Sequence, residues 1–117
     1  MPERKLSSTN FYNQTFLEEK CALNELINLL SKRWITEVLF SIEEGNNRFT
    51  SLKEDLEHIS DHMLGLRLKL LQQHELISKL QIKDSPPRTE YALTDKGLEL
   101  SALLDNLCKF AEKEIQF

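Results

Sequence analysis

Residues 59–73 have the sequence ISDHMLGLRLKLLQQ, and this run decides the fold that the chain is predicted to adopt. Ser60 suits the cap of a helix, because a serine hydroxyl at that position accepts a hydrogen bond from a backbone N–H of the first turn. At about 100° per residue, three side chains share one narrow sector of this helix, and we assign them to the core: Leu64, Leu68 and Leu71. We expect the helix to end at about Gln73.

Three shorter helical patterns precede this run. Apolar residues recur at three- and four-residue steps over residues 23–30 and again over 35–42, and Gly45 is expected to end the second helix. Residues 48–49 form a short extended piece, and Thr50 is predicted to cap a third helix of only two turns. A short helix, a tight turn and a longer helix together indicate a helix-turn-helix.

Two β-prone runs follow the long helix, at residues 77–83 and 89–93, with two adjacent prolines between them. Thr94 then begins a last helix with a broad apolar face. The predicted fold class is therefore mainly α with a small β-hairpin wing, a winged helix-turn-helix. We divide the chain into an N-terminal arm (1–20), the winged helix-turn-helix (21–94) and a C-terminal helix (95–117).

Composition and charge limit the classes of function. The 117 residues are 40% hydrophobic and 29% charged, which is typical of one globular domain. No apolar run approaches the ~18 residues of a membrane span, and the polar start does not resemble a signal peptide, so we expect a cytoplasmic protein. The net charge is −4, but residues 60–90 carry five basic against four acidic residues, the part of the chain that a polyanion repels least.

No pattern of catalytic chemistry emerges. The chain has no GxSxG, no HExxH and no Gly-rich phosphate loop, so we expect neither an enzyme nor a cofactor. His58 and His62 have a spacing found in metal sites, but a predicted turn separates them and no third ligand is evident, so no metal site is expected. Cys21 and Cys108 lie far apart and are expected to be thiols, with Cys108 serving to pack the core or a dimer surface.

One side of the 60–73 helix is the candidate DNA-contacting face. It offers donors and acceptors for base edges, one cation, and a glycine where the backbone could approach closely: Ser60, Asp61, His62, Gly65, Lys69 and Gln72. The alternative is a face that is merely solvated. A second apolar stripe includes Leu66 and Leu70; we expect Leu70 to be covered within the chain and Leu66 to border the DNA surface.

The hairpin supplies three cations that could contact phosphates: Lys79, Lys83 and Arg88. Lys83 and Arg88 flank its tip and are the best phosphate candidates. The Pro86-Pro87 pair stiffens this tip, so that less conformational entropy is lost on docking.

With these residues the sequence resembles the HxlR-type branch of the winged-helix transcription regulators, relatives of the MarR group. The matching residues follow in order along roughly residues 21–110, and include KRW at 32–34, ISDHML at 59–64, PPR with EY at 86–91, LT at 93–94, and Gly97. The sequence departs from the family pattern at Ala22, at Ser31, and at Leu66 and Leu70, where polar residues are commoner.

The resemblance implies a DNA-binding regulator, in expectation a repressor, that acts on double-stranded DNA as a homodimer paired through its terminal helices. The dimer surface would include the last helix and the aromatic arm: Leu100, Leu103, Leu104, Leu107, Ala111 and Ile115, with Phe11, Tyr12 and Phe16. The alternative for the last helix is that it closes the core of the monomer.

The resemblance also implies that Cys21 senses oxidants or electrophiles, which makes a small reactive effector an expected partner. Its place at the start of a helix favours a thiolate, and the alternative is a small buried apolar residue. A second class of function is a winged-helix module that binds protein instead of DNA, which the acidic net charge and Leu66 favour.

Overall fold

The computed structural model of the chain describes residues 22–116. They fall in two compact units, one up to Arg33 and one from Trp34 onward, and each is described by itself. In the first unit, residues 22–31 form a helix, as the apolar spacing predicted. The Lys32 N–H closes its last turn by donating to the Leu29 carbonyl at 3.1 Å.

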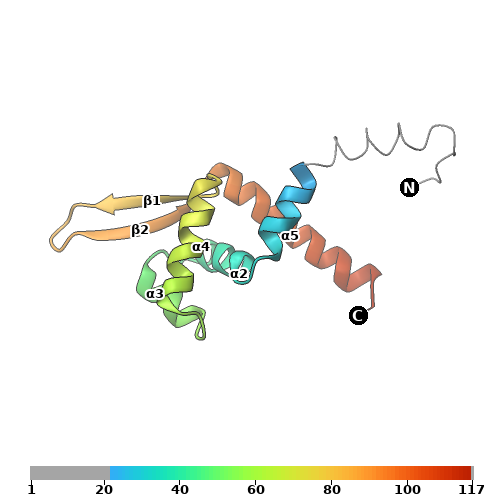
Figure 1. The fold of residues 1–117 in the computed structure, drawn as a ribbon, viewed down its shortest axis with the longest axis horizontal. Coiled ribbons are helices and arrows are strands. Elements are labelled where there is room, and N and C mark those ends of the chain that lie inside the picture. The colour runs from blue at the N-terminus through green and yellow to red at the C-terminus, as the bar shows by residue number, and fades with distance from the viewer. Residues whose placement is uncertain (1–21, 117) are drawn as a thin grey trace, which may run out of the picture. The chain divides into compact units, whose positions relative to one another are not determined.

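The second unit contains four helices and one antiparallel hairpin (Figure 1). Their order along the chain is α2 (Ile35–Glu43), α3 (Phe49–Asp55), α4 (Asp61–Gln73), β1 (Ile77–Ile82), β2 (Arg88–Leu93) and α5 (Asp95–Glu114). Figure 1 shows α4 running across the base of the hairpin, which extends away from the helices as a wing. The predicted fold class, a mainly α winged helix-turn-helix, is confirmed.

One hydrophobic core joins these elements. Its fully buried side chains come chiefly from α2 and α4, with one each from α3 and the turn before α4: Ile35, Val38, Leu39, Leu52, Ile59, Leu64, Leu68 and Leu71. The three leucines of α4 that the sequence assigned to the core are exposed by no more than 2%. Each buried leucine or isoleucine contributes about 1.5–3 kcal/mol through removal of apolar surface from water.

The ends of the helices are only partly as predicted. Ser60 caps α4, since its Oγ accepts from the Met63 N–H at 3.0 Å, and Gly45 follows α2 with φ of 112°, as glycine allows. The prediction that Thr50 caps α3 is wrong. That helix begins at Phe49 with Arg48 at the cap position, two residues earlier than predicted. The Ser51 hydroxyl accepts from the Arg48 N–H at 3.2 Å and donates to the Arg48 carbonyl at 2.9 Å.

The wing is anchored at its base and built on a regular register. The pairs run from Ile77 opposite Leu93 to Ile82 opposite Arg88, within one residue of the predicted strands. The Tyr91 N–H donates to the Asn47 carbonyl at 2.7 Å, which ties β2 to the loop between α2 and α3. Burial of the Tyr91 side chain raises the pKa of its hydroxyl.

The start of α5 is fitted closely against the end of α4. Thr94 caps α5 as predicted, because its Oγ1 accepts from the Gly97 N–H at 3.1 Å and donates to the Glu75 carbonyl at 2.6 Å. The Thr94 N–H also donates to the Leu76 carbonyl at 3.1 Å. A Cβ atom at Gly97 would lie 2.1 Å from the same Leu76 oxygen, so only glycine fits at this position without a shift of the backbone.

Candidate nucleic-acid interface

The outer face of α4 is the first part of the candidate interface. At about 100° per residue, Leu66 lies roughly 170° around the helix from the middle of the three core leucines. In this projection Leu66 lies between Gln73 on one side and Leu70 on the other, with His62 and Lys69 beyond Gln73. Leu66, His62, Lys69 and Gln73 are exposed, and Leu70 is half-buried. Asp61 and Gly65 are exposed but lie nearer the edge of the core sector, so the outer face is polar on one side of Leu66 and apolar on the other.

Negative charge is nearly absent from this face. Residues 62–74 contain no Asp or Glu, in a chain that has 19 of them. The carboxylate of Asp61 is paired with the Lys53 ammonium at 3.0 Å, and Lys53 also donates to the Ile59 carbonyl at 2.5 Å. Asp61 therefore complements the N-terminal end of the α4 dipole and links α4 to α3. The remaining charges of α4 are those of Arg67 and Lys69.

The predicted base-contacting residues differ in how available they are. Lys69 is exposed and forms no ion pair with any residue that the structure describes. Ser60 and His62 are also exposed, although the Ser60 oxygen already caps the helix. Gln72 is half-buried, and its Nε2 donates back to the Leu68 carbonyl at 3.2 Å, so its amide donor is directed at its own helix.

Gly65 has an unusual position for a residue in the middle of a helix. A Cβ atom built there would meet no heavy atom within 4 Å. Glycine costs about 1 kcal/mol of helix propensity relative to alanine, and no packing inside the described chain accounts for that cost. The helix therefore exposes its backbone at Gly65.

The wing carries the second set of candidate residues. Arg88, one of the two best phosphate candidates from the sequence, is held inside the hairpin: its Nη1 lies 2.9 Å from Asp84 and its Nε 2.7 Å from Glu90. Hydrogen bonds to Glu90 and then Asp84 raise the pKa of the guanidinium above its ordinary high value. The two carboxylates neutralise this arginine, which braces the hairpin across its tip.

Lys79 and Lys83 are the remaining cations of the wing. Both side chains are exposed, and neither forms an ion pair within residues 22–116. The sequence alone could have distinguished these two lysines from Arg88, because Asp84 lies four residues before Arg88 and Glu90 lies two residues after it. Spacing of two along a strand places Glu90 on the same face as Arg88.

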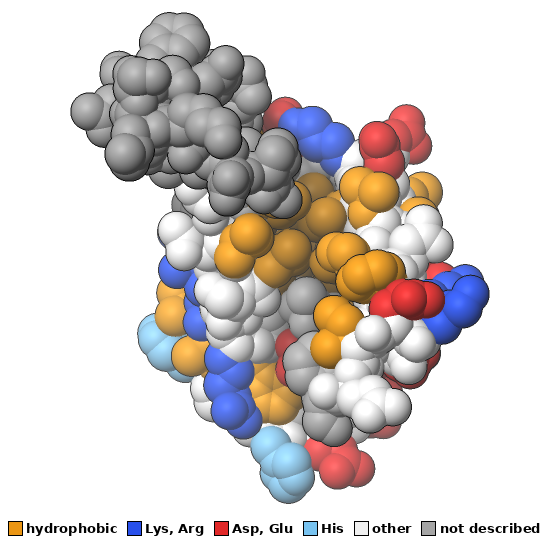
Figure 2. Space-filling model, turned by 90° about the vertical axis from the view of Figure 1, so that its right-hand side faces the viewer, with side chains coloured by type: hydrophobic (Ala, Val, Ile, Leu, Met, Phe, Trp, Pro, Cys, Tyr) orange, Lys and Arg blue, Asp and Glu red, His pale blue; other side chains and the backbone are white. Residues whose placement is uncertain are grey.

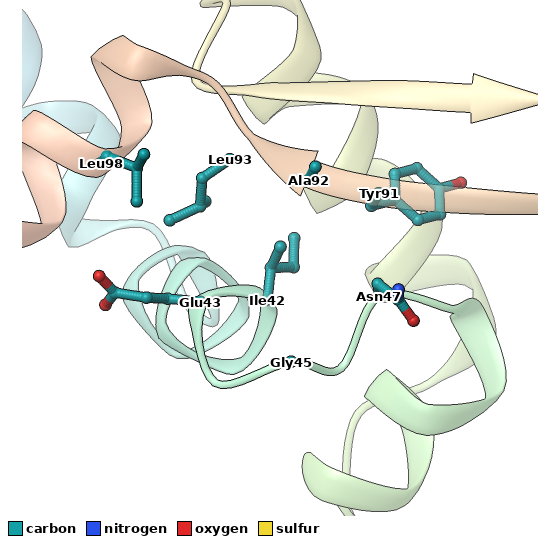
Figure 3. Close-up of a pocket in the computed structure, with 8 residues that line it drawn as sticks. All are labelled: Ile42, Glu43, Gly45, Asn47, Tyr91, Ala92, Leu93 and Leu98. Atoms are coloured by element: carbon teal, nitrogen blue, oxygen red, sulfur yellow. The ribbon is translucent and has the colours of Figure 1, made fainter.

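A hollow of about 300 Å³ lies between α2, β2 and the start of α5 (Figure 3). Its lining residues are Ile42, Glu43, Gly45, Asn47, Tyr91, Ala92, Leu93 and Leu98. Figure 3 shows Leu93 and Leu98 converging on Ile42, while the Glu43 carboxylate and the Tyr91 hydroxyl point outward at opposite ends. Glu43 accepts a hydrogen bond from Ser101 at 2.5 Å, so its carboxylate is used to join α2 to α5.

The last helix presents a row of exposed apolar side chains. Leu103, Leu107 and Phe110 are between 55% and 59% exposed, and Ile115, just after the end of α5, is 43% exposed. Figure 2 shows hydrophobic side chains gathered near the middle of one face. The sequence analysis did not name Phe110, which is exposed in the same row. The side chain of Leu100 is only 8% exposed and packs in the core of the monomer. Leu104 and Ala111 are half-buried. Cys108 is an exposed free thiol and is not part of the core.

Four of the predicted site residues lie outside the range 22–116, which is the part of the chain that the structure describes: Phe11, Tyr12, Phe16 and Cys21. Within those described residues, no group of three or more His, Cys, Asp or Glu side chains could hold a metal ion. No helix in the same range is long and apolar enough to cross a membrane.

The helix-turn-helix, the wing and α5 together correspond to a known family. A model of the HxlR-like helix-turn-helix matches residues 29–117. The chain belongs to the HxlR family. The resemblance inferred from the sequence motifs is thereby confirmed, and with it the general assignment to transcription regulation.

Relatives of this HxlR-family chain include the HTH-type transcriptional regulator YvaP of Bacillus subtilis (strain 168), which is 35% identical over 89 residues, 76% of this chain and 82% of YvaP. Among solved structures, the reduced form of the B. subtilis regulator YodB superposes with a TM-score of 0.76 at 29% identity, covering 81% of this chain and 93% of YodB. Diamide-treated YodB superposes with a TM-score of 0.71 at 30% identity, covering 80% and 93%.

Proposed function

We propose that this HxlR-family chain is a sequence-specific DNA-binding repressor that acts as a homodimer on double-stranded DNA. The observation that carries the proposal is the outer face of α4. This helix is capped by Ser60, contains no acidic residue after Asp61, and exposes Lys69, which has no ion pair within residues 22–116. A helix of this kind fits the major groove, where its side chains can contact base edges. A dimer seated on operator DNA would repress by excluding other proteins from it.

The wing supplies affinity in this proposal. Lys79 and Lys83 are exposed and unpaired within the described chain, so each can replace a counterion at a DNA phosphate. Arg88 keeps the hairpin rigid through Asp84 and Glu90 instead of contacting DNA directly. In this proposal Arg88 and Lys83 therefore have different roles.

Homodimerisation is proposed through α5, with a second copy of the chain as the occupant. Leu103, Leu107 and Phe110 are each at least 55% exposed, and burying them against an identical helix would remove their apolar surface from water. Two copies are also what a palindromic operator requires, because the two recognition helices then enter successive major grooves about 34 Å apart. The arm residues Phe11, Tyr12 and Phe16 are proposed to extend this surface.

A response to oxidants through Cys21 is proposed as the regulatory part of the function. The support comes from YodB, which has been solved both reduced and after diamide treatment. Oxidation of the Cys21 thiolate would change the dimer and so its affinity for DNA. Cys21→Ser should abolish the response to diamide and leave reduced-state binding intact, whereas the matched control Cys108→Ser should respond normally.

The salt dependence of DNA binding tests the central proposal. The chain is incubated with duplexes from its own genomic neighbourhood, and log K is measured against log salt. Removing both wing lysines (Lys79→Ala with Lys83→Ala) deletes four phosphate contacts per dimer and should reduce the slope by about 3.6, at about 0.9 per contact. Arg88→Ala is the control, and it should change the slope far less because Asp84 and Glu90 already neutralise that charge.

Two results would contradict the proposal. If wild-type protein bound no duplex selectively at any salt concentration, DNA would not be its partner, and the protein-binding alternative would hold. If the double lysine variant kept the wild-type slope, the wing would not contact phosphates, although α4 could still be the recognition helix.

A further inference from the structure

Leu66 is an exposed apolar side chain on the outer face of α4, nearly opposite the three core leucines. It is 43% exposed, and in helical projection it lies between Gln73 and Leu70, with His62 and Lys69 beyond Gln73. Single exposed leucines are ordinary on protein surfaces. This one is distinguished by its place, because it lies nearly opposite the core leucines on the helix that we propose enters the major groove.

A shallow groove of about 320 Å³ runs beside Leu66. Its lining residues are Leu66, Arg67, Lys69, Leu70 and Gln73. Leu70 is half-buried, so its remaining exposed surface adds to that of Leu66, and the two leucines line the groove together with Arg67, Lys69 and Gln73. The lining contains two basic residues and an amide but no carboxylate, which suits a polyanionic occupant with a small apolar group on its edge.

The chemistry of the major groove limits what that apolar group can be. Guanine, cytosine and adenine present only hydrogen-bonding atoms there, and thymine alone presents a methyl group, on its C5 atom. A leucine aimed at the floor of the groove gains nothing from an acceptor or donor, but it removes a methyl group from water. Leu66 is therefore suited to one of the four bases.

We propose that Leu66 and the groove beside it hold the 5-methyl group of a thymine in each half-site of the operator, so that Leu66 specifies a T·A pair at that position. The inference rests on the proposed DNA-binding function and adds to it a named base and a named atom. Lys69, one turn along the same stripe, then faces the adjacent base pair, where its ammonium can donate to the acceptors of a guanine.

The experiment replaces the 5-methyl group of a thymine by hydrogen and changes nothing else in the duplex. An operator is first selected from random duplexes with wild-type protein, and each thymine of one half-site is then exchanged for deoxyuridine in turn. Wild-type affinity, measured by fluorescence anisotropy, should fall about fourfold at one thymine, which is the burial of one methyl group, about 0.8 kcal/mol, expressed as a ratio. Changing the symmetric thymine as well should give about sixteenfold.

Leu66→Ala should bind the original operator several-fold more weakly and be indifferent to the exchange at that thymine. Leu80→Ala is the matched control: Leu80 is 45% exposed, similar to Leu66, but lies on β1, so this variant should keep the full sensitivity to deoxyuridine. A reciprocal measurement places cytosine or 5-methylcytosine at the same position, and wild type should prefer the methylated duplex by about fourfold. That preference should also be absent in Leu66→Ala.

The inference is overturned if wild-type protein selects an operator yet tolerates deoxyuridine at every thymine, or if Leu66→Ala stays as sensitive as wild type. It is also overturned if Leu66→Ala changes the sedimentation of the protein without changing base preference, because Leu66 would then contact protein. Were the alanine variant to unfold, the deoxyuridine and methylcytosine series on wild type would still decide the question. If wild-type protein bound no duplex selectively, the proposed function itself would be refuted.

Discussion

Replacing Gly97 by alanine would place a methyl group almost on top of the Leu76 carbonyl. The ideal Cβ lies 2.1 Å from that oxygen and 3.1 Å from its carbon, whereas Cβ atoms in proteins essentially never come within 3.0 Å of another atom. The obstacle is backbone on the last turn before β1, so it cannot rotate aside as a side chain would. The start of α5 must therefore retreat from the end of α4 by roughly 1 Å.

The size of the effect follows from what that retreat disturbs. Thr94 makes two hydrogen bonds across this contact, from its N–H to the Leu76 carbonyl at 3.1 Å and from its Oγ1 to the Glu75 carbonyl at 2.6 Å. Losing both costs about 2 kcal/mol, overpacking adds about 2 kcal/mol, and the better helix propensity of alanine returns about 1 kcal/mol. Gly97→Ala should thus lower the free energy of unfolding by about 3 kcal/mol.

Thermal and urea denaturation followed by circular dichroism measure this loss, and Tm should fall by roughly 10 °C or more. Gly65→Ala is the matched control, because it makes the same change inside α4, where a Cβ atom meets nothing within 4 Å. That variant should gain up to about 1 kcal/mol and melt at a higher temperature. Equal stabilities for Gly97→Ala and wild type would refute the close contact between α5 and Leu76.

Three further predictions concern the interface and the core. Gly65→Ala should weaken DNA binding measured by anisotropy despite its gain in stability, and unchanged affinity would show that nothing approaches the helix backbone there. Ser41→Ala removes a buried hydroxyl that donates to Asp55 at 2.5 Å, so unfolding in urea should show a loss of about 2 kcal/mol; a loss below about 0.5 kcal/mol would contradict this. Leu107→Glu should convert the proposed dimer to a monomer in sedimentation equilibrium while Glu112→Gln does not, and a dimeric Leu107→Glu would exclude this part of α5 from the interface.

Interactions within a few residues could be predicted from the sequence. The caps at Ser60 and Thr94 and the glycine after α2 depend on groups no more than three residues away, and they are where the sequence placed them. The burial of Leu64, Leu68 and Leu71 followed from helical periodicity alone. The cap predicted for α3 was wrong. The hydroxyls of Thr50 and Ser51 lie next to each other at the start of this helix, and it is Ser51 that bonds to the backbone of Arg48.

The sequence by itself thus determined which segments become helices and strands, and which face of α4 is buried, because periodicity and capping are local. Only the tertiary structure decided which predicted site residues are available. It buries Leu100 in the core and leaves Phe110 exposed. It also shows that a Cβ atom at Gly97 would clash with the carbonyl of Leu76, 21 positions earlier, whereas a Cβ atom at Gly65 would meet no atom within 4 Å. These outcomes depend on which separate elements pack against one another, and the spacing of residues along the chain does not specify that packing.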